Sequence, residues 1–166
     1  DAIPAINSEK SIALFSKHNV FSPSELHSRA EVLYESYSKA INIEAKTMIS
    51  MVNVQFIPTI IKYTKRLADA INSIKAAVPD VDISVQTDLL KKTSKLLTEV
   101  DQALKKLQDL MEEASTIEVG VKSANFFKDK VVPAMQELRA PVDALELIVD
   151  KDLWPVPTYG ELLFEI

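Results

Sequence analysis

Apolar residues recur at steps of three and four through residues 22–78, and this pattern predicts one long amphipathic helix. The stretch contains no glycine, and its only proline after the start is Pro58. Ser22, Pro23 and Glu25 open it with a capping box and a proline in the first helical position, which together indicate a helix start. At 1.5 Å per residue such a helix would be about 80 Å long, more than one small domain needs for itself.

Residues 84–117 have the most regular apolar pattern in the chain and predict a second long helix, capped by Asp82 or Ser84. Two neighbouring rows of apolar positions favour a helix inside a three- or four-helix bundle over a two-stranded coiled coil. The first row is Leu90, Thr93, Leu97, Val100, Leu104, Leu107, Met111 and Ala114, and the second is Leu89, Leu96, Ala103, Leu110 and Ile117.

A third long helix is predicted from about residue 119 to residue 149, with Pro133 and Pro141 inside it. Each proline removes a backbone hydrogen bond and tends to bend a helix. Pro58 and Pro133 lie in similar strings, FIPTI and VVPAM. We therefore expect two bends that could match across a packed helix pair.

The two ends of the chain differ from this long-helix pattern. We expect residues 1–7 to form an extended lead-in. A short helix should follow, capped by Asn7 or Ser8 and ending near His18. Asn19 suits a left-handed position after that helix, and Phe21 can act as a hydrophobic staple against Leu26. At the other end, the tail carries two prolines that disfavour a helix, so we expect an extended path. Its apolar side chains require it to dock on the bundle or on another surface.

The predicted fold class is all-α. It is an antiparallel bundle of three long helices plus a short N-terminal helix, with an extended C-terminal tail. We expect one domain over residues 1–166, in which 1–21 are the lead-in and short helix, 22–149 the bundle and 150–166 the docking tail. A chain of this length can bury a core of its own.

Composition agrees with this fold and narrows the chemistry. The chain has two glycines, against a usual share of about 7%, which disfavours both tight hairpins and phosphate-binding loops. It has no cysteine and a net charge of −5 with scattered lysines and arginines, which gives no basic face for a nucleic acid. No apolar run is long enough to span a membrane, and no signal peptide is seen. We expect a cytoplasmic protein, and the start at Asp1 suggests a processed product or a piece of a larger one.

Catalytic and metal-binding motifs are not found in the sequence. His27 and Glu31 lie four residues apart on a helix, but no third metal ligand has a suitable spacing, so we interpret His27 as a surface residue. We therefore predict no catalytic, cofactor-binding or metal-binding residue in this segment.

The predicted lengths leave part of the first long helix uncovered. Two helices that fold back from residue 78 over about 45 Å reach only to about residue 47. The segment 22–46 would then overhang, covered on one side by the short helix, and expose an apolar surface to a partner. That surface is formed by Leu33, Tyr34, Tyr37, Ile41 and Ile43. Asn42 and Glu44 either lie exposed there or make a buried polar contact. The predicted interface residues are Tyr34, Tyr37, Ile41, Asn42 and Glu44, together with Trp154, Tyr159 and Phe164 of the tail.

Several strings resemble the C-terminal region of type III glutamine synthetases, the large bacterial form. The resemblance covers nearly the whole chain, although residues 84–117 match in pattern only, and Asn19 stands where the family often has glycine. The strings are HNVFSPSELHSRAEVLYESY (18–37), INIEAKTM (41–48), FIPTIIKY (56–63), FFKDKVVPAMQELRAPVD (126–143) and LWPVPTYGELLFEI (153–166).

This resemblance implies a parent enzyme that ligates ammonia to glutamate with ATP and Mg or Mn, in stacked hexameric rings. Its catalytic motifs would lie in an upstream catalytic domain, so the segment alone is predicted to be inactive. Its role would be structural, regulatory or in subunit packing, with that catalytic domain and neighbouring subunits as partners. The alternative is an independent helical interaction or adaptor module without an enzymatic parent.

Overall fold

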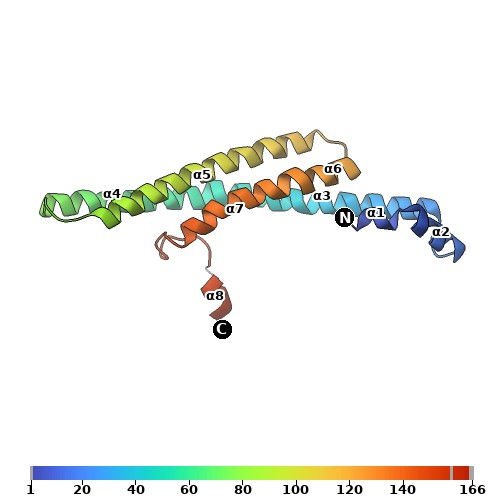
Figure 1. The fold of residues 1–166 in the computed structure, drawn as a ribbon, viewed down its shortest axis with the longest axis horizontal. Coiled ribbons are helices and arrows are strands. Elements are labelled where there is room, and N and C mark those ends of the chain that lie inside the picture. The colour runs from blue at the N-terminus through green and yellow to red at the C-terminus, as the bar shows by residue number, and fades with distance from the viewer. Residues whose placement is uncertain (1, 158, 165–166) are drawn as a thin grey trace. The chain divides into compact units, whose positions relative to one another are not determined.

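The computed structural model describes residues 2–157 and 159–164, which form helices and no strand. The predicted all-α fold class is confirmed (Figure 1). The elements in chain order are α1 (Ile3–Ile6), α2 (Glu9–Lys17), α3 (Pro23–Met51), η1 (Val52–Phe56), α4 (Ile57–Ala77), α5 (Ser84–Ser115), α6 (Val121–Phe126), η2 (Phe127–Val131), α7 (Val132–Glu146) and α8 (Tyr159–Phe164), where η marks a π-helical segment.

Contacts along the chain group these helices into two compact units. Unit 1 comprises residues 1–46 and 109–133, and unit 2 comprises residues 47–108 and 134–166. The sequence predicts a single bundle over residues 22–149, whereas the contacts divide that stretch. The first division falls at Lys46, where the sequence places the end of the overhanging segment.

The start of α3 has the capping box that the sequence predicts. The Ser22 backbone N–H donates to a Glu25 carboxylate oxygen at 2.7 Å, and the Glu25 N–H donates to Ser22 Oγ at 3.3 Å. The Ser22 hydroxyl also donates to the same Glu25 carboxylate at 2.8 Å. These bonds satisfy backbone donors that the first turn of a helix leaves without partners.

A Schellman motif ends α2 and turns the chain into α3. Asn19 has a φ of 53°, the left-handed conformation expected for it. The Val20 N–H donates to the Phe15 carbonyl at 3.0 Å, and the Asn19 N–H donates to the Ser16 carbonyl at 3.1 Å, which is the bond pair of that motif. Phe21 then packs against Phe15 in a tilted arrangement, with ring centroids 5.6 Å apart.

Two five-residue π-helical segments precede Pro58 and Pro133. The Ile57 N–H donates to the Val52 carbonyl, and the Val132 N–H donates to the Phe127 carbonyl, both across five residues. In each case the proline is the second residue of the α-helix that follows. The wider π-helical turn keeps a backbone N–H to carbonyl hydrogen bond just before the proline, which has no backbone N–H to donate. The two prolines thus share one local structure, as their similar strings suggest.

Each unit has its own apolar core, and α5 contributes to both. The first predicted row of α5 is buried from Thr93 onward except for half-buried Leu97, whereas the second row is half-buried. The buried hydrophobic residues of unit 1 are Leu26, Ala30, Ala45, Met111, Ala114, Ala124, Phe127 and Val131. Those of unit 2 are Val52, Phe56, Ile60, Val100, Leu104, Leu107, Ala134, Leu138, Val142, Leu145, Val149 and Trp154.

Both chain ends correct the sequence prediction. Residues 3–6 are helical rather than extended, because Pro4 fits the first turn of a helix and the Ser8 and Ser11 hydroxyls donate to the Ala5 carbonyl at its end. In the tail, residues 155–157 are non-helical as expected, but residues 159–164 form α8. The prolines restrict only their own neighbourhood, so a short helix can follow them.

Trp154 docks the start of the tail on unit 2. Its indole is 9% exposed and lies 5.0 Å from the Phe56 ring between centroids. Nearby, Arg66 Nη1 pairs with Asp150 Oδ2 at 3.2 Å. Trp154 therefore packs within unit 2, whereas the docking of the rest of the tail stays a prediction.

The capping box predicts a pH-dependent stability. Hydrogen bonds from the Ser22 backbone and hydroxyl lower the pKa of Glu25, with a smaller contribution from Arg29. Because the folded-state pKa is depressed, this stabilisation is present above the ordinary carboxyl pKa and is lost as pH falls through the lowered value. Urea unfolding followed by circular dichroism should show this acid-side loss in the wild type and less of it in Glu25→Gln.

Ser22→Ala should lower the free energy of unfolding by about 1 kcal/mol, since it removes the N-cap oxygen. Ser28→Ala, an exposed change further along the same helix, serves as the control and should cost nothing because alanine favours helix interiors. An equal decrease in the free energy of unfolding in the two variants would contradict the assignment of Ser22 as the N-cap.

Trp154 is the only tryptophan, so its fluorescence reports whether the tail is docked. Phe56→Ala should shift the emission to the red and destabilise the chain by about 3–5 kcal/mol, because it leaves a cavity against the indole. Phe15→Ala, a change at the other aromatic pair, is the control and should leave the emission unshifted. An unshifted Phe56→Ala spectrum would show that the indole is not held by this ring.

Candidate functional site

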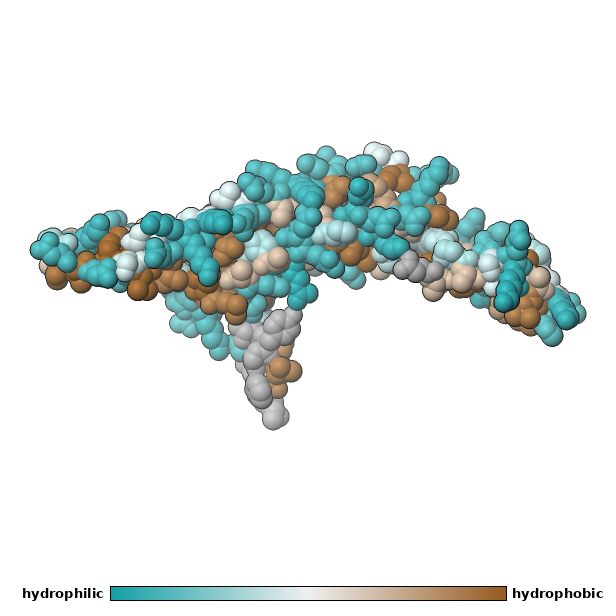
Figure 2. Space-filling model, in the orientation of Figure 1, coloured by the Kyte–Doolittle hydropathy of each residue, from teal (hydrophilic) through white to brown (hydrophobic). Residues whose placement is uncertain are grey.

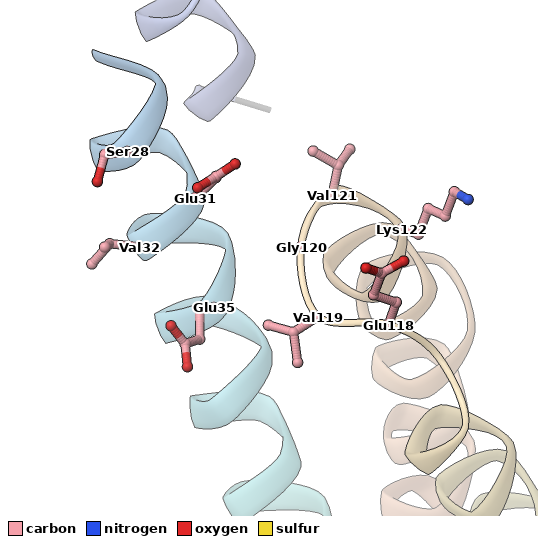
Figure 3. A pocket seen from close by; sticks show the side chains of 9 residues that line it. All are labelled: Ser28, Glu31, Val32, Glu35, Glu118, Val119, Gly120, Val121 and Lys122. Carbon is pink, nitrogen blue, oxygen red and sulfur yellow. The ribbon is translucent and has the colours of Figure 1, made fainter. Parts of the chain in front are cut away.

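The larger groove that unit 1 presents lies between α3 and the turn that precedes α6 (Figure 3). It has a volume of about 590 Å³. Gly120, with a φ of 134°, makes that turn and starts α6, because a side chain is strained in this conformation. The lining residues are Ser28, Glu31, Val32, Glu35, Glu118, Val119, Gly120, Val121 and Lys122.

The groove combines carboxylates with valines. Figure 3 shows Glu31 reaching from α3 toward the turn and Val119 pointing back toward α3, while Lys122 points away. Glu35 is paired with Lys39 at 2.6 Å. Such a surface suits an apolar side chain flanked by a cation, and its negative carboxylates disfavour a phosphate or another anion.

A smaller groove of about 270 Å³ lies further along α3 in the same unit. Asn42 and Lys46 line one side, and Met111, Ile117 and Phe127 line the other. Ser38 is buried beside it and donates its hydroxyl to the Tyr34 carbonyl at 2.9 Å. The hydroxyl is thus satisfied within its own helix, and the groove is mainly apolar.

These grooves correct the prediction that residues 22–46 overhang with only the short helix beside them. Residues 109–133 belong to the same unit and lie opposite α3 as far as Ser28. The estimate from helix lengths missed this because residues 116–120 continue beyond the end of α5 and carry α6 along α3. The segment is therefore covered on a second side.

The predicted interface residues of α3 differ in how far they are buried. Tyr34, Tyr37 and Ile41 are half-buried in unit 1. The question left open for the polar pair is answered, because Glu44 is exposed and Asn42 is half-buried in the smaller groove.

Trp154 lies in the core of unit 2 against Phe56, so its surface is used within the chain. The side chains of Tyr159 and Phe164 lie outside the described part of the structure, and their role stays a prediction.

Sequence reasoning identified only part of an exposed strip on α3, here called the outer α3 face and made of Val32, Leu33, Ala40 and Ile43. It named Leu33 and Ile43 but not Val32 and Ala40. Val32 is 57% exposed and Ile43 is 65% exposed. The spacings of seven from Leu33 to Ala40, three from Ala40 to Ile43 and eleven from Val32 to Ile43 place the four residues on one side of the helix. The apolar side chains were visible in the sequence, but only the packed partner shows which side of α3 stays open.

Both histidines are exposed, and His27 makes a hydrogen bond between two segments of the chain. The Asn7 amide donates to His27 Nδ1 at 2.7 Å and links the start of α2 to α3. Within the described residues no three His, Cys, Asp or Glu side chains gather as a metal site would require. No helix in that part of the chain is both long enough and apolar enough to cross a membrane.

Tyr63 is a further perturbed group, in unit 2. Burial raises the pKa of its phenol, and the negative charge of Asp150 raises it further. The same Asp150 pairs with Arg66. The Arg66–Asp150 pair links the segment after α7 to α4, beside Tyr63.

Comparison with known proteins finds similarity to one family. Residues 1–75 match the family model of the glutamine synthetase C-terminal domain. The chain is 36% identical to a type-3 glutamine synthetase of Dictyostelium discoideum over 99% of the chain and 23% of that protein. It is 32% identical to a glutamine synthetase of Butyrivibrio fibrisolvens over 100% of the chain and 24% of that protein.

A glutamine synthetase of Bacteroides fragilis is 24% identical over 99% of the chain and 23% of that protein. The chain thus spans about a quarter of the length of the curated relatives it matches. The sequence resemblance suggested a bacterial family. Dictyostelium is a eukaryote, so the relatives are not confined to bacteria. The chain is thus similar to glutamine synthetases along its whole length, and its residues 1–75 match the C-terminal domain of that family.

Proposed function

We propose that this domain is a non-catalytic packing module of a glutamine synthetase, which stabilises contacts between the catalytic part of the polypeptide and neighbouring subunits. The observation that carries the proposal is the outer α3 face. Val32 and Ile43 stay more than half exposed after unit 1 has formed its own core. Exposed apolar residues grouped on one helix face are typical of a protein contact.

The chemistry of the larger groove supports the same role. This groove carries the carboxylates of Glu31, Glu35 and Glu118, which disfavour nucleotide phosphates. On this proposal ATP and Mg or Mn belong to the rest of the parent enzyme, which ligates ammonia to glutamate in the cytoplasm and assembles as stacked hexameric rings.

An independent adaptor module is the less favoured alternative. The three relatives that match 99–100% of the chain are all named glutamine synthetases, and the match takes up about a quarter of each. Sequencing the parent gene distinguishes the two proposals, since an adaptor requires a reading frame that starts close to Asp1.

The isolated chain should neither bind ATP nor catalyse γ-glutamyl transfer. Isothermal titration with Mg-ATP should give no binding heat, and the transferase assay should stay at background. The full-length enzyme measured in parallel is the positive control. Turnover or saturable ATP binding by the isolated chain would refute the non-catalytic assignment.

In the full-length enzyme, Val32→Glu with Ile43→Glu should weaken assembly, because two charges would be buried in an apolar contact. Size-exclusion chromatography with light scattering should show smaller species, with activity falling in parallel. The same double variant of the isolated chain should unfold like the wild type, since both sites are exposed there.

Ala13→Glu adds a charge at an exposed position of α2 and is the control that should leave assembly intact. Assembly unchanged in the double variant would show that the outer α3 face is not buried between subunits.

A further inference from the structure

The hairpin of α4 and α5 in unit 2 has a distal part, called here the hairpin arm, formed by residues 62–95 (Figure 1). Near its base, Asp150 pairs with Arg66, and α7 has already ended at Glu146. From residue 67 to residue 92 no residue is fully buried. In the arm, therefore, α4 and α5 pack on each other, and the described part of the chain places no third helix there that buries any residue between 67 and 92.

The arm nevertheless carries the apolar residues of a bundle helix. Where α7 is present, Val100 and Leu107 of α5 are fully buried. In the arm, the equivalent residues of both helices are only half-buried, and three valines are exposed at its tip (Figure 2). The half-buried residues are Leu67, Ile71, Ile74, Leu89 and Leu90, and the tip valines are Val78, Val81 and Val85, which are 55%, 40% and 68% exposed.

Charge is unevenly distributed along the arm, although Lys75 lies next to the tip and Asp69 lies next to the base. The tip, residues 76–88, contains aspartates and neither lysine nor arginine. The base, residues 62–66 and 91–95, contains lysines and an arginine and no carboxylate. The acidic set is Asp80, Asp82 and Asp88, and the basic set is Lys62, Lys65, Arg66, Lys91, Lys92 and Lys95. At 1.5 Å per residue the tip lies about 20 Å from residues 62–66 of α4 and about 5–15 Å from residues 91–95 of α5.

We propose that the hairpin arm binds the arm of a second copy, antiparallel and around a twofold axis, to form a four-helix bundle. Two hairpins with half-covered apolar faces complete each other's core in this way. In a twofold contact each surface meets its own copy, so the acidic tip of one arm lies on the basic base of the other at both ends. Parallel arms would instead place like charges together.

Existing ion pairs in the arm do not oppose this contact. Lys91 lies 3.8 Å from Asp88, and both side chains are about three-quarters exposed. An exposed pair of this kind contributes about 0–1 kcal/mol, so exchanging it for a pair across the contact costs little.

This inference deepens the proposed packing role by naming the surface and the geometry of one contact. Its test uses the chain alone, so a failure here leaves the outer α3 face and the assembly of the full enzyme to be judged separately. Asp82 is left unchanged in the design, because its carboxylate accepts the Ser84 N–H at 2.8 Å at the start of α5.

The test is a charge exchange. One variant, Asp80→Lys with Asp88→Lys, changes the formal charge of the tip from −3 to +1. The other, Lys62→Glu, Lys65→Glu, Lys92→Glu and Lys95→Glu, changes the formal charge of the base from +6 to −2. All six side chains are exposed, so circular dichroism should show both variants folded. In sedimentation experiments at low salt, wild type should dimerise, each variant alone should be monomeric, and an equimolar mixture should form the heterodimer.

The control is Glu112→Lys with Glu113→Lys, which adds the same charge as the first variant at exposed positions outside the arm. It should dimerise like the wild type. A monomeric wild type, variants that still dimerise alone, or a mixture that stays monomeric would each overturn the proposal. Val85→Glu, at an exposed site of the apolar face, should give a monomer if the dimer uses that face.

Discussion

Backbone hydrogen bonding past Pro58 is the constraint on which the long helices depend. A proline inside a helix removes a donor and clashes with the preceding turn, yet residues 23–77 stay helical on both sides of it. The π-helical segment 52–56 resolves this by widening one turn, so the Ile57 N–H reaches the Val52 carbonyl. The apolar stripe can then continue through Phe56 and Ile60, both of which are buried.

Where the helices do end, a specific residue ends them. Asn19 takes the left-handed conformation after α2, and Gly120 starts α6 from an extended, positive-φ turn. Ser22 and Asp82 satisfy backbone N–H groups at the starts of α3 and α5. With so few glycines, the chain places its turns at these positions, and the lengths between them decide which helical segments can pair.

The parts of the fold that rest on local chemistry could be read from the sequence. The Ser22–Glu25 capping box, the left-handed Asn19 and the buried row of α5 depend on residues within a few turns of each other. The reach of residues 109–133 along α3 could not be read in this way, because it depends on the path of the 116–120 turn. The outer α3 face depends on that packing, so the candidate site was only partly predictable. Asn42 was identified, whereas Val32 was not.

The segment before Pro58 did leave a trace in the sequence. Met48, Val52, Phe56 and Ile60 follow each other at three steps of four, which is slower than the 3.6 residues per turn of an α-helix. A single turn of π-helix accounts for such a drift.

A π-helical turn is equivalent to one extra residue in an α-helix, so segments 52–56 and 127–131 act as phase adjusters. Each residue advances an α-helix by about 100°. The π-helical segment 52–56 absorbs that angle, so Val52 and Ile60 are both buried although they are eight residues apart. Deleting one residue within 52–56 would let an ordinary α-turn form and would keep Ile60 on the buried side, because seven residues make about two α-helical turns. The same deletion elsewhere in α3 or α4 would rotate the downstream part of the helix by about 100°. The two five-residue segments are therefore the places in the long helices where the loss of one residue leaves the core-facing side unchanged.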